Sequence, residues 1–272
     1  MKKRRVPSEV YDRDYLLSEN TEGYEDFKSG SLSHVKQLQL DLLELGPATT
    51  LLEVGLGRGE FLLHCAKRGA VVAGIDYSES AIDIARSTLA AVPEADLRTA
   101  DCKALPFDSD SFQRVYAGDV LEHQDIEDGA VMLQEMYRVL EPGGFLLVHT
   151  APNAIFMKVV YPIAKPILRL IDPGTVEALE NHLVVNRKVH VHEYTTLSLR
   201  RVARMAGLNN AEIWIGEDLL RSSRHRHTAK LSDNRLVGWI GSLGRLRLVR
   251  FFLGNDLFLK VHKPAGKVAA VG

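Results

Sequence analysis

Three glycines and a carboxylate have the types and the spacing of a loop that binds a nucleotide. An apolar run over residues 50–54 is followed directly by Gly55, Gly57 and Gly59, and a second apolar run ends at Asp76. Glycine lets the backbone approach a ligand closely, and a carboxylate after the second strand can accept hydrogen bonds from both ribose hydroxyls. The pattern therefore predicts a ligand that contains adenosine.

Two further carboxylates narrow the choice of ligand. The turn reads Gly-x-Gly-x-Gly, whereas a dinucleotide-binding turn reads Gly-x-Gly-x-x-Gly. Glu53 lies in the first strand, and Glu60 lies in the first turn of the following helix. Carboxylates at these places would repel a pyrophosphate but suit a ligand that carries an ammonium and a sulfonium. This argues against NAD.

The elements that must position these residues alternate between strand and helix. We expect a strand at 50–54, a helix at 60–67, a strand at 70–75 and a helix at 78–91 whose N-cap is Ser78. This order is typical of the nucleotide-binding half of a doubly wound sheet, in which the turn and the acidic residue lie at the carboxyl ends of the strands.

Five motifs in chain order make the sequence similar to the class I S-adenosylmethionine-dependent methyltransferases, and in particular to small-molecule methyltransferases of the ubiquinone and menaquinone pathways. The motifs are residues 52–59, 101–107, 111–115, 119–123 and 138–144. The similarity is close over residues 48–152 and weaker over 189–208. It implies an α/β fold with a doubly wound, Rossmann-like, seven-stranded and mostly parallel sheet, an antiparallel last strand and helical insertions.

The resemblance also implies a set of residues that bind S-adenosylmethionine. Gly55 and Gly57 would pass under the methionine moiety, and Asp76 would hold the ribose. Tyr77 would lie against the adenine face, Asp101 would accept from the adenine amino group with the Cys102 backbone beside it, and Asp119 would lie near the methionine. The predicted cofactor-binding set is Glu53, Gly55, Gly57, Gly59, Asp76, Tyr77, Asp101, Cys102 and Asp119.

His123 is the predicted catalytic residue. Methyl transfer is an in-line displacement, so the protein mainly positions two reactants, and a base is needed only if the acceptor must lose a proton. His123 follows the fourth strand and titrates near neutral pH, which suits a general base. The alternative is that His123 orients a loop or stacks on the acceptor.

Histidines also raise the question of a metal. His190 and His192 would lie on one face of an extended segment, and some similar enzymes with a pair such as Glu122 and His123 use a divalent cation. No further cluster with ligand spacing accompanies the two histidines, whereas the pair Glu122 and His123 leaves the question open. We therefore predict no metal.

Residues 1–46 are predicted to form an N-terminal helical lid with a helix at 32–45, and residues 47–272 a methyltransferase domain with insertions at 151–188 and 217–255. The aromatic residues of the lid would either stack on a ligand or anchor the lid; they are Tyr11, Tyr15, Tyr24 and Phe27. We expect Pro162 and Pro166 to break the helix of the first insertion. That insertion would cover an apolar acceptor, rest on a membrane surface, or simply cap the core.

The formal net charge of −1 is the sum of an acidic and a basic segment of the chain. Residues 1–199 carry a net charge of −10 and residues 200–272 a net charge of +9. The basic excess lies mostly at 217–255 and would suit anionic lipid, a phosphate-bearing acceptor or a partner chain, or would simply pack beside the acidic body. Nucleic acid is a less suitable partner, because the body is acidic.

The remaining features concern location. Cys65 and Cys102 are expected to be reduced, buried thiols, and neither a signal peptide nor an apolar run long enough to span a bilayer is recognisable. These features predict a cytoplasmic protein that could associate with the inner membrane surface. The expected function is methyl transfer from S-adenosylmethionine to oxygen on a small-molecule, lipid-linked or glycan-linked acceptor. The alternatives are N- or C-methylation, and a non-catalytic cofactor-binding subunit of a membrane or protein complex.

Overall fold

The structure of the chain is a computed structural model. It describes residues 6–171 except 20 and 22, scattered positions between 173 and 183, residues 189–216, and residues 250–266 except 253. Most of the basic segment 217–255 therefore lies outside the described residues. The charged start of the chain, at residues 1–5, also lies outside them.

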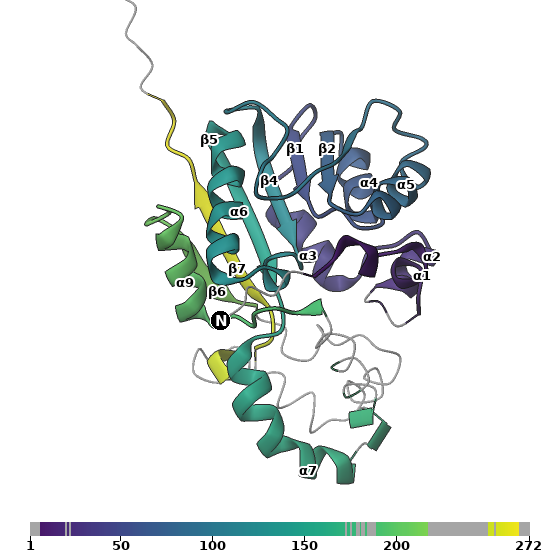
Figure 1. Ribbon diagram of the computed structural model, residues 1–272, viewed down its shortest axis with the longest axis vertical. Helices are drawn as coiled ribbons and strands as arrows, with labels where there is room; N and C mark the ends of the chain where they lie inside the picture. Colours follow the sequence, from purple (N-terminus) through teal and green to yellow (C-terminus); the bar gives the residue numbers. More distant parts are fainter. Residues whose placement is uncertain are drawn as a thin grey trace, which may run out of the picture.

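Seven strands form one twisted sheet, seen in Figure 1. They are β1 (Thr50–Val54), β2 (Val71–Asp76), β3 (Asp96–Thr99), β4 (Phe112–Gly118), β5 (Leu140–Thr150), β6 (Glu212–Ile215) and β7 (Leu257–His262). Their order is β3-β2-β1-β4-β5-β7-β6. The first five are parallel, and β7 is antiparallel to both β5 and β6. The predicted fold class is confirmed, including the antiparallel hairpin at the end.

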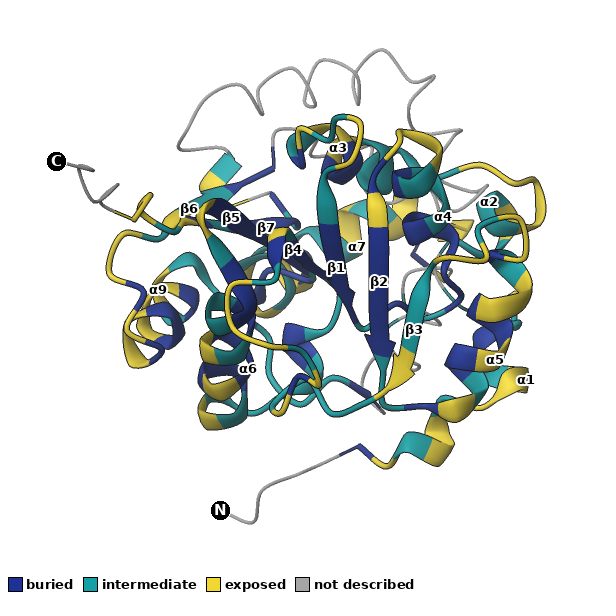
Figure 2. Ribbon diagram, turned by 90° about the horizontal axis from the view of Figure 1, so that it is seen from above, coloured by how far each residue is buried: buried dark blue, intermediate teal, exposed yellow. Residues whose placement is uncertain are grey.

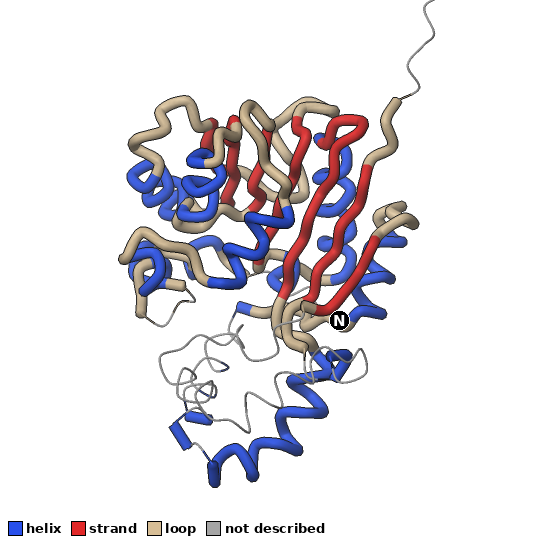
Figure 3. Tube along the Cα trace, turned by 180° about the vertical axis from the view of Figure 1, so that it is seen from behind, coloured by secondary structure: helices blue, strands red, loops and turns tan. Residues whose placement is uncertain are grey.

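Helices cover both faces of this sheet (Figures 1 and 3). They are α1 (Arg13–Leu16), α2 (Tyr24–Lys28), α3 (His34–Leu42), α4 (Glu60–Lys67), α5 (Glu79–Thr88), α6 (Ile126–Val139), α7 (Tyr161–Ile171) and α9 (Thr196–Met205). Side-chain caps fix several starts: the Ser78 hydroxyl accepts from the backbone N–H of Ala81, as expected, and Thr195 forms a capping box with Ser198.

The core lies in two layers, one on each face of the sheet. Strand residues alternate between them, so Leu52 and Val115 pack towards α6 and α9, whereas Leu51 and Leu147 pack towards α3, α4 and α5. The central strands are therefore buried on both faces, as Figure 2 shows. Burial on two faces explains why these strands read as continuous apolar runs.

The first insertion differs from the prediction, because its prolines do not break the helix. A π-helical turn, η3 (Phe156–Val160), leads directly into α7, and Pro166 lies inside α7. In this turn the N–H of Tyr161 donates to the carbonyl of Phe156, and Pro162 is the second residue of α7, where a helix tolerates the missing N–H. Figure 1 shows that α7 extends away from the sheet.

Candidate active site

The glycine turn joins β1 to α4 at the carboxyl edge of the sheet. Gly55 and Gly57 both have left-handed backbone angles, with φ of +77° and +54°. A side chain at Gly55 would overlap the side chain of Val120, whereas a Cβ at Gly57 would meet no atom within 4 Å. Gly55 is thus required by close packing, and Gly57 leaves open space in which a ligand could approach the backbone.

Gly59 has a different position from the one expected for a cofactor-binding residue. Its φ is +77°, and a Cβ there would lie 2.9 Å from the Cβ of Ala85 and 2.8 Å from Leu89. Gly59 is therefore the point at which the start of α4 packs against α5. This contact supports the fold rather than providing an open ligand surface.

Asp76 ends β2, and its carboxylate is fixed by two backbone donors. The N–H of Gly57 donates to Oδ2 at 3.1 Å, and the N–H of Ser78 donates to Oδ1 at 3.0 Å. Burial raises the pKa of Asp76, and these backbone hydrogen bonds oppose that rise. Each oxygen keeps a further lone pair, so Asp76 can still accept from the two hydroxyls of a ribose.

Glu53 and Glu60 have separate environments, which corrects the idea that both face the ligand. Glu60 is paired with Arg58 at 2.9 Å and Lys36 at 2.6 Å, and these cations lower its pKa to about 2 despite burial. Glu53 is buried on β1, and its Oε2 atom has no hydrogen-bond partner among the described residues. Burial raises the pKa of Glu53 well above its ordinary value. An ammonium group would supply the missing partner, so only Glu53 supports a cationic ligand.

The N-terminal segment lies across the same edge. The Arg58 guanidinium donates to the carbonyl of Leu16 and to the hydroxyl of Thr21, each at 3.1 Å. The ring of Tyr11 lies 5.6 Å from that of Tyr77, centre to centre. Residues 6–21 are therefore fastened to the glycine turn and lie beside the residue predicted to contact adenine.

Asp101 and Cys102 follow β3 along the chain. The Asp101 carboxylate accepts from the N–H of Lys103 at 3.0 Å, and the Lys103 ammonium donates to Asp128 on α6 at 2.8 Å. Burial raises the pKa of the Cys102 thiol to about 12, so the thiol is neutral. Both cysteines are free: Cys65 is buried, as expected, and Cys102 is half-buried.

His123 ends a short 3-10 helix, η2 (Leu121–His123), just after β4. Its Nδ1 atom lies 3.0 Å from the carbonyl oxygen of Val189 and 2.8 Å from the hydroxyl of Tyr11. Because a carbonyl can only accept, Nδ1 carries the proton and Nε2 keeps its lone pair. Burial lowers the pKa of His123, so the imidazole is neutral at pH 7 and can take a proton at Nε2.

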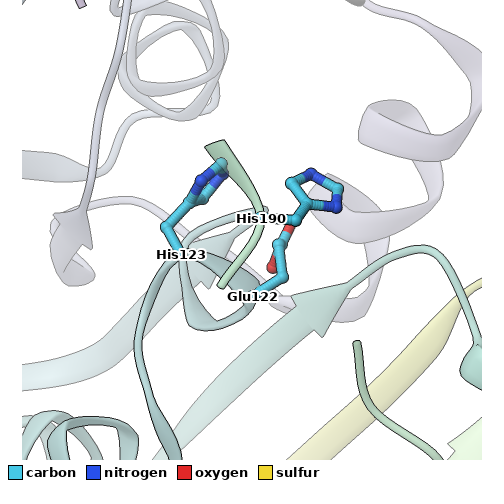
Figure 4. Close-up of side chains that lie close together, drawn as sticks. All are labelled: Glu122, His123 and His190. Atoms are coloured by element: carbon cyan, nitrogen blue, oxygen red, sulfur yellow. The ribbon is translucent and has the colours of Figure 1, made fainter. Parts of the chain in front are cut away.

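Two segments bring Glu122, His123 and His190 together, as Figure 4 shows. One potential ligand atom from each lies within 4.8 Å of the others. The backbone N–H groups of Val191 and His192 both donate to the carbonyl of Glu122, at 2.8 and 3.0 Å. His192 itself does not join this group; its ring packs against Tyr194 at 4.6 Å. Of the two histidines that the sequence places on one face, only His190 lies in this group.

The Glu122 carboxyl is buried and accepts from the hydroxyl of Thr150 at 2.7 Å. Burial and the nearby charge of Asp119 raise the pKa of Glu122 to about 8. Burial and the neighbouring carboxylate thus favour the protonated form of this carboxyl.

Sequence reasoning missed several residues that shape the site, namely Tyr11 as a partner of His123, and Arg58, His149, Thr150 and Asp256. Arg58 lies inside the motif at residues 52–59. A charged side chain between two glycines of that motif was the signal that could have identified it. The others come from distant parts of the chain, and only the fold brings them to the site.

The sheet order, the glycine turn and the acidic residue after β2 are the arrangement expected from the resemblance to class I S-adenosylmethionine-dependent methyltransferases. Residues 52–148 match the family described as a methyltransferase domain. The chain therefore carries a methyltransferase domain over these residues, and the resemblance found in the sequence is confirmed.

Similar proteins agree on this class. A 2-phytyl-1,4-naphthoquinone methyltransferase of Thermosynechococcus vestitus is 35% identical over 124 residues, which cover 44% of this chain and 54% of the relative. The ubiquinone/menaquinone biosynthesis C-methyltransferase UbiE of Geotalea daltonii is 29% identical over 127 residues, covering 44% and 53%. The match thus spans about half the length of these curated relatives.

One solved structure illustrates the agreement in fold. A phosphoethanolamine N-methyltransferase 2 of Haemonchus contortus, in complex with phosphomonomethylethanolamine and S-adenosylhomocysteine, has a TM-score of 0.59 and 16% identity. The comparison covers 95% of this chain and 60% of that chain.

Proposed function

We propose that this protein transfers the methyl group of S-adenosylmethionine to an oxygen atom of a small-molecule, lipid-linked or glycan-linked acceptor. The main observation in support of this cofactor is the buried Glu53 oxygen, which has no hydrogen-bond partner among the described residues. Gly57 leaves open space at the same edge of the sheet, and the Asp76 carboxylate is held there by a backbone hydrogen bond. A cofactor with an ammonium, a sulfonium and a ribose fits these three features.

Each residue of the site would then have a separate role in binding or in proton transfer. When it is bound, S-adenosylmethionine supplies an electrophilic methyl group on sulfur. Asp76 would hold the ribose, and Asp119 would lie beside the methionine end. As the bond between the methyl carbon and the acceptor oxygen forms and the carbon–sulfur bond breaks, His123 would take the acceptor proton at Nε2.

A radiolabelled-methyl assay with a panel of quinones, glycans and polyketides tests the activity. Label on an acceptor oxygen supports the proposal, whereas label on carbon or nitrogen supports C- or N-methylation. The first of these alternatives is favoured by the quinone C-methyltransferase among the relatives. Cofactor binding with no labelled acceptor would favour a non-catalytic subunit.

Asp76→Ala is expected to raise the dissociation constant of S-adenosylmethionine roughly 10- to 100-fold, because hydrogen bonds to a charged group contribute about 1.5–3 kcal/mol. Isothermal titration calorimetry measures this directly. Asp83→Ala is the matched control, since Asp83 is an exposed aspartate on α5 that pairs with Arg86. An unchanged affinity in Asp76→Ala would disprove the ribose assignment.

Chelation with EDTA is expected to leave methyl transfer unchanged. The Glu122–His123–His190 cluster has suitable donor atoms for a cation, but the sulfonium already makes the methyl group electrophilic. Methyl transfer and bound metal would be measured before and after chelation. Activity that disappears with EDTA and returns with Mn²⁺ would contradict the prediction, and His190→Ala would then be expected to abolish the response to Mn²⁺.

We further propose that the protein associates with an anionic membrane surface through residues 217–255. The described part of the chain contains no helix that is both long and apolar enough to cross a bilayer. However, α7 presents Ile163, Ile167 and Leu170 to solvent, with 72%, 61% and 87% of each residue exposed. This apolar row is consistent with a helix that lies on a lipid surface.

Reversing the charges of Arg245, Arg247 and Arg250 to glutamate is expected to weaken binding to vesicles of anionic lipid at least about 100-fold, because each basic residue near such a surface contributes about 1 kcal/mol. Vesicle flotation measures the bound fraction. Reversal of Lys67, Arg68 and Arg86 is the control for net charge. Equal flotation of both variants would refute the role of the basic segment.

A further inference from the structure

His149 joins the predicted cofactor edge to the last strand of the sheet. It is the second-last residue of β5 and is only 2% exposed. Its Nδ1 atom lies 2.9 Å from Oδ1 of Asp119, and its Nε2 atom lies 3.0 Å from Oδ1 of Asp256. One buried imidazole therefore bridges two carboxylates whose positions in the chain are 137 residues apart.

The two contacts determine the protonation state of the ring. A neutral imidazole donates from one nitrogen only, so it could satisfy one carboxylate but would turn a lone pair towards the other. The imidazolium donates from Nε2 to Asp256 and places its positive charge beside both carboxylates; the Nδ1 contact with Asp119 is an ion pair without the geometry of a hydrogen bond. The two carboxylates raise the pKa of His149 well above its ordinary value although burial opposes this, and His149 in turn lowers the pKa of Asp119.

Asp119 depends on His149 through its backbone as well as its side chain. It has a left-handed φ of +57°, which is uncommon for a residue with a side chain. Its N–H donates to the carbonyl of His149 at 3.1 Å. The Asp119 side chain is 39% exposed, so part of its carboxylate faces the edge of the sheet. His149 thus fixes the carboxylate that the sequence assigns to the methionine end of the cofactor.

Asp256 is held in place by backbone hydrogen bonds at and beside it. Its carbonyl accepts from the N–H of Gly216 at 2.9 Å, and the neighbouring Asn255 carbonyl accepts from the N–H of Asn153 at the same distance. The side chain of Asp256 is 10% exposed. Asp256 contacts His149 but forms no ion pair or hydrogen bond with Asp119 in the described part of the chain.

Other charged groups surround this arrangement. Asp119 raises and His149 lowers the pKa of the buried Glu122 on η2, while Lys36 on α3 and His123 on η2 lower the pKa of Asp119. None of these groups takes the place of His149, because it alone lies between the two aspartates. A change at Asp256 should therefore reach Asp119 only through the charge and position of the imidazole.

We propose that His149 is a positioning residue for the cofactor: held as an imidazolium by Asp256, it aims the Asp119 carboxylate at the ammonium group of S-adenosylmethionine. The inference depends on the proposed function, because it assumes that this edge binds the cofactor. It assigns a role to two residues, His149 and Asp256, that would not touch the cofactor themselves.

The test is calorimetric binding of S-adenosylmethionine between about pH 6 and 9.5, compared for the wild-type protein, Asp256→Asn and Asp110→Asn. Asp110 is the matched control, since it forms an ion pair with Lys263 at 2.6 Å on the opposite edge of the sheet. The amino group of the cofactor titrates near pH 7.7–8.0 in model compounds and does so with every variant, so only differences between the curves report on the protein.

Affinity is expected to fall at alkaline pH as His149 loses its proton, and in Asp256→Asn this fall should begin at a lower pH than in the wild type. Asp110→Asn should follow the wild-type curve. His149→Gln keeps a side-chain amide but no charge, and is expected to bind at least about tenfold more weakly at pH 7. A purely structural role would change the melting temperature without moving the pH dependence of binding.

Asp119→Asn supplies a second measurement in case a single variant is unstable. In that background, Asp256→Asn should cause little further loss of affinity, because the group through which it acts is already uncharged. Coincident curves for Asp256→Asn and the wild type, or additive losses in the double variant, would overturn the inference and leave the proposed function intact. A wild-type protein that binds no cofactor would overturn both.

Discussion

His123→Ala is expected to lower the rate constant of methyl transfer in a single turnover by about 10²- to 10⁴-fold, the range that a positioned general base contributes. The Nδ1 atom of His123 faces the Val189 carbonyl, so the lone pair that would accept the proton is on Nε2. The dissociation constant of S-adenosylmethionine should stay within about twofold. Rapid-quench measurements of labelled product, with calorimetry in parallel, give both values.

The pH dependence gives an independent check of this role. A base must be unprotonated, and burial lowers the pKa of His123 below its ordinary value. The rate should therefore fall only as the pH drops below that lowered value, and near neutral pH it should not change with the protonation of His123, because the imidazole is already in its neutral form. His64→Ala is the control, since His64 lies on α4 outside the site. A His123→Ala protein with a normal rate would show that the residue merely orients its loop.

Arg58→Ala is expected to lower the free energy of unfolding by about 3 kcal/mol, because it removes one partner of a buried ion pair and leaves Glu60 less well compensated. It also removes the donors that hold the Leu16 carbonyl and the Thr21 hydroxyl. Amide exchange should therefore become faster over residues 6–28 than over the strands. Denaturant unfolding and hydrogen exchange measure the two effects.

Arg86→Ala is the matched control for this prediction, since Arg86 forms an exposed ion pair with Asp83 at 3.1 Å. Such pairs contribute about 0–1 kcal/mol. The Glu60 carboxyl adds a dependence on pH: its pKa is lowered from 4.5 to about 2 on folding, so its contribution is present above about pH 4.5 and is lost as the pH falls through 2. Equal stabilities of Arg58→Ala and Arg86→Ala would contradict the anchoring role.

Local patterns were sufficient to predict most of the fold. The strand at 50–54 and the helix at 60–67 have the expected bounds, and Ser78 caps the helix that it precedes. These features depend on burial on both faces, glycine geometry and hydrogen bonds within a few residues, all of which a single segment of sequence determines. The antiparallel hairpin of β6 and β7 followed from the resemblance to the family.

The parts that could not be predicted depend on contacts between distant segments. His149 lies 107 positions from Asp256, and no local pattern relates them. The charge of Glu60 could be read from the sequence, but its neutralisation by Lys36 could not, because Lys36 comes from another helix. The effect of the prolines was misjudged because Pro162 falls in the first turn of α7, where the N–H that proline lacks is not needed, and Pro166 is accommodated inside the helix.

Tyr11 contacts both parts of the site: the part predicted to bind the methyl acceptor and the part predicted to bind the cofactor. Its hydroxyl lies 2.8 Å from His123, and its carbonyl accepts from Ser78, next to the predicted ribose partner, at 2.7 Å. If this segment must detach before either product leaves, departure of the methylated acceptor and of S-adenosylhomocysteine is governed by a single gate. We then expect a burst of product in the first turnover, followed by a slower steady rate set by the opening of residues 6–21.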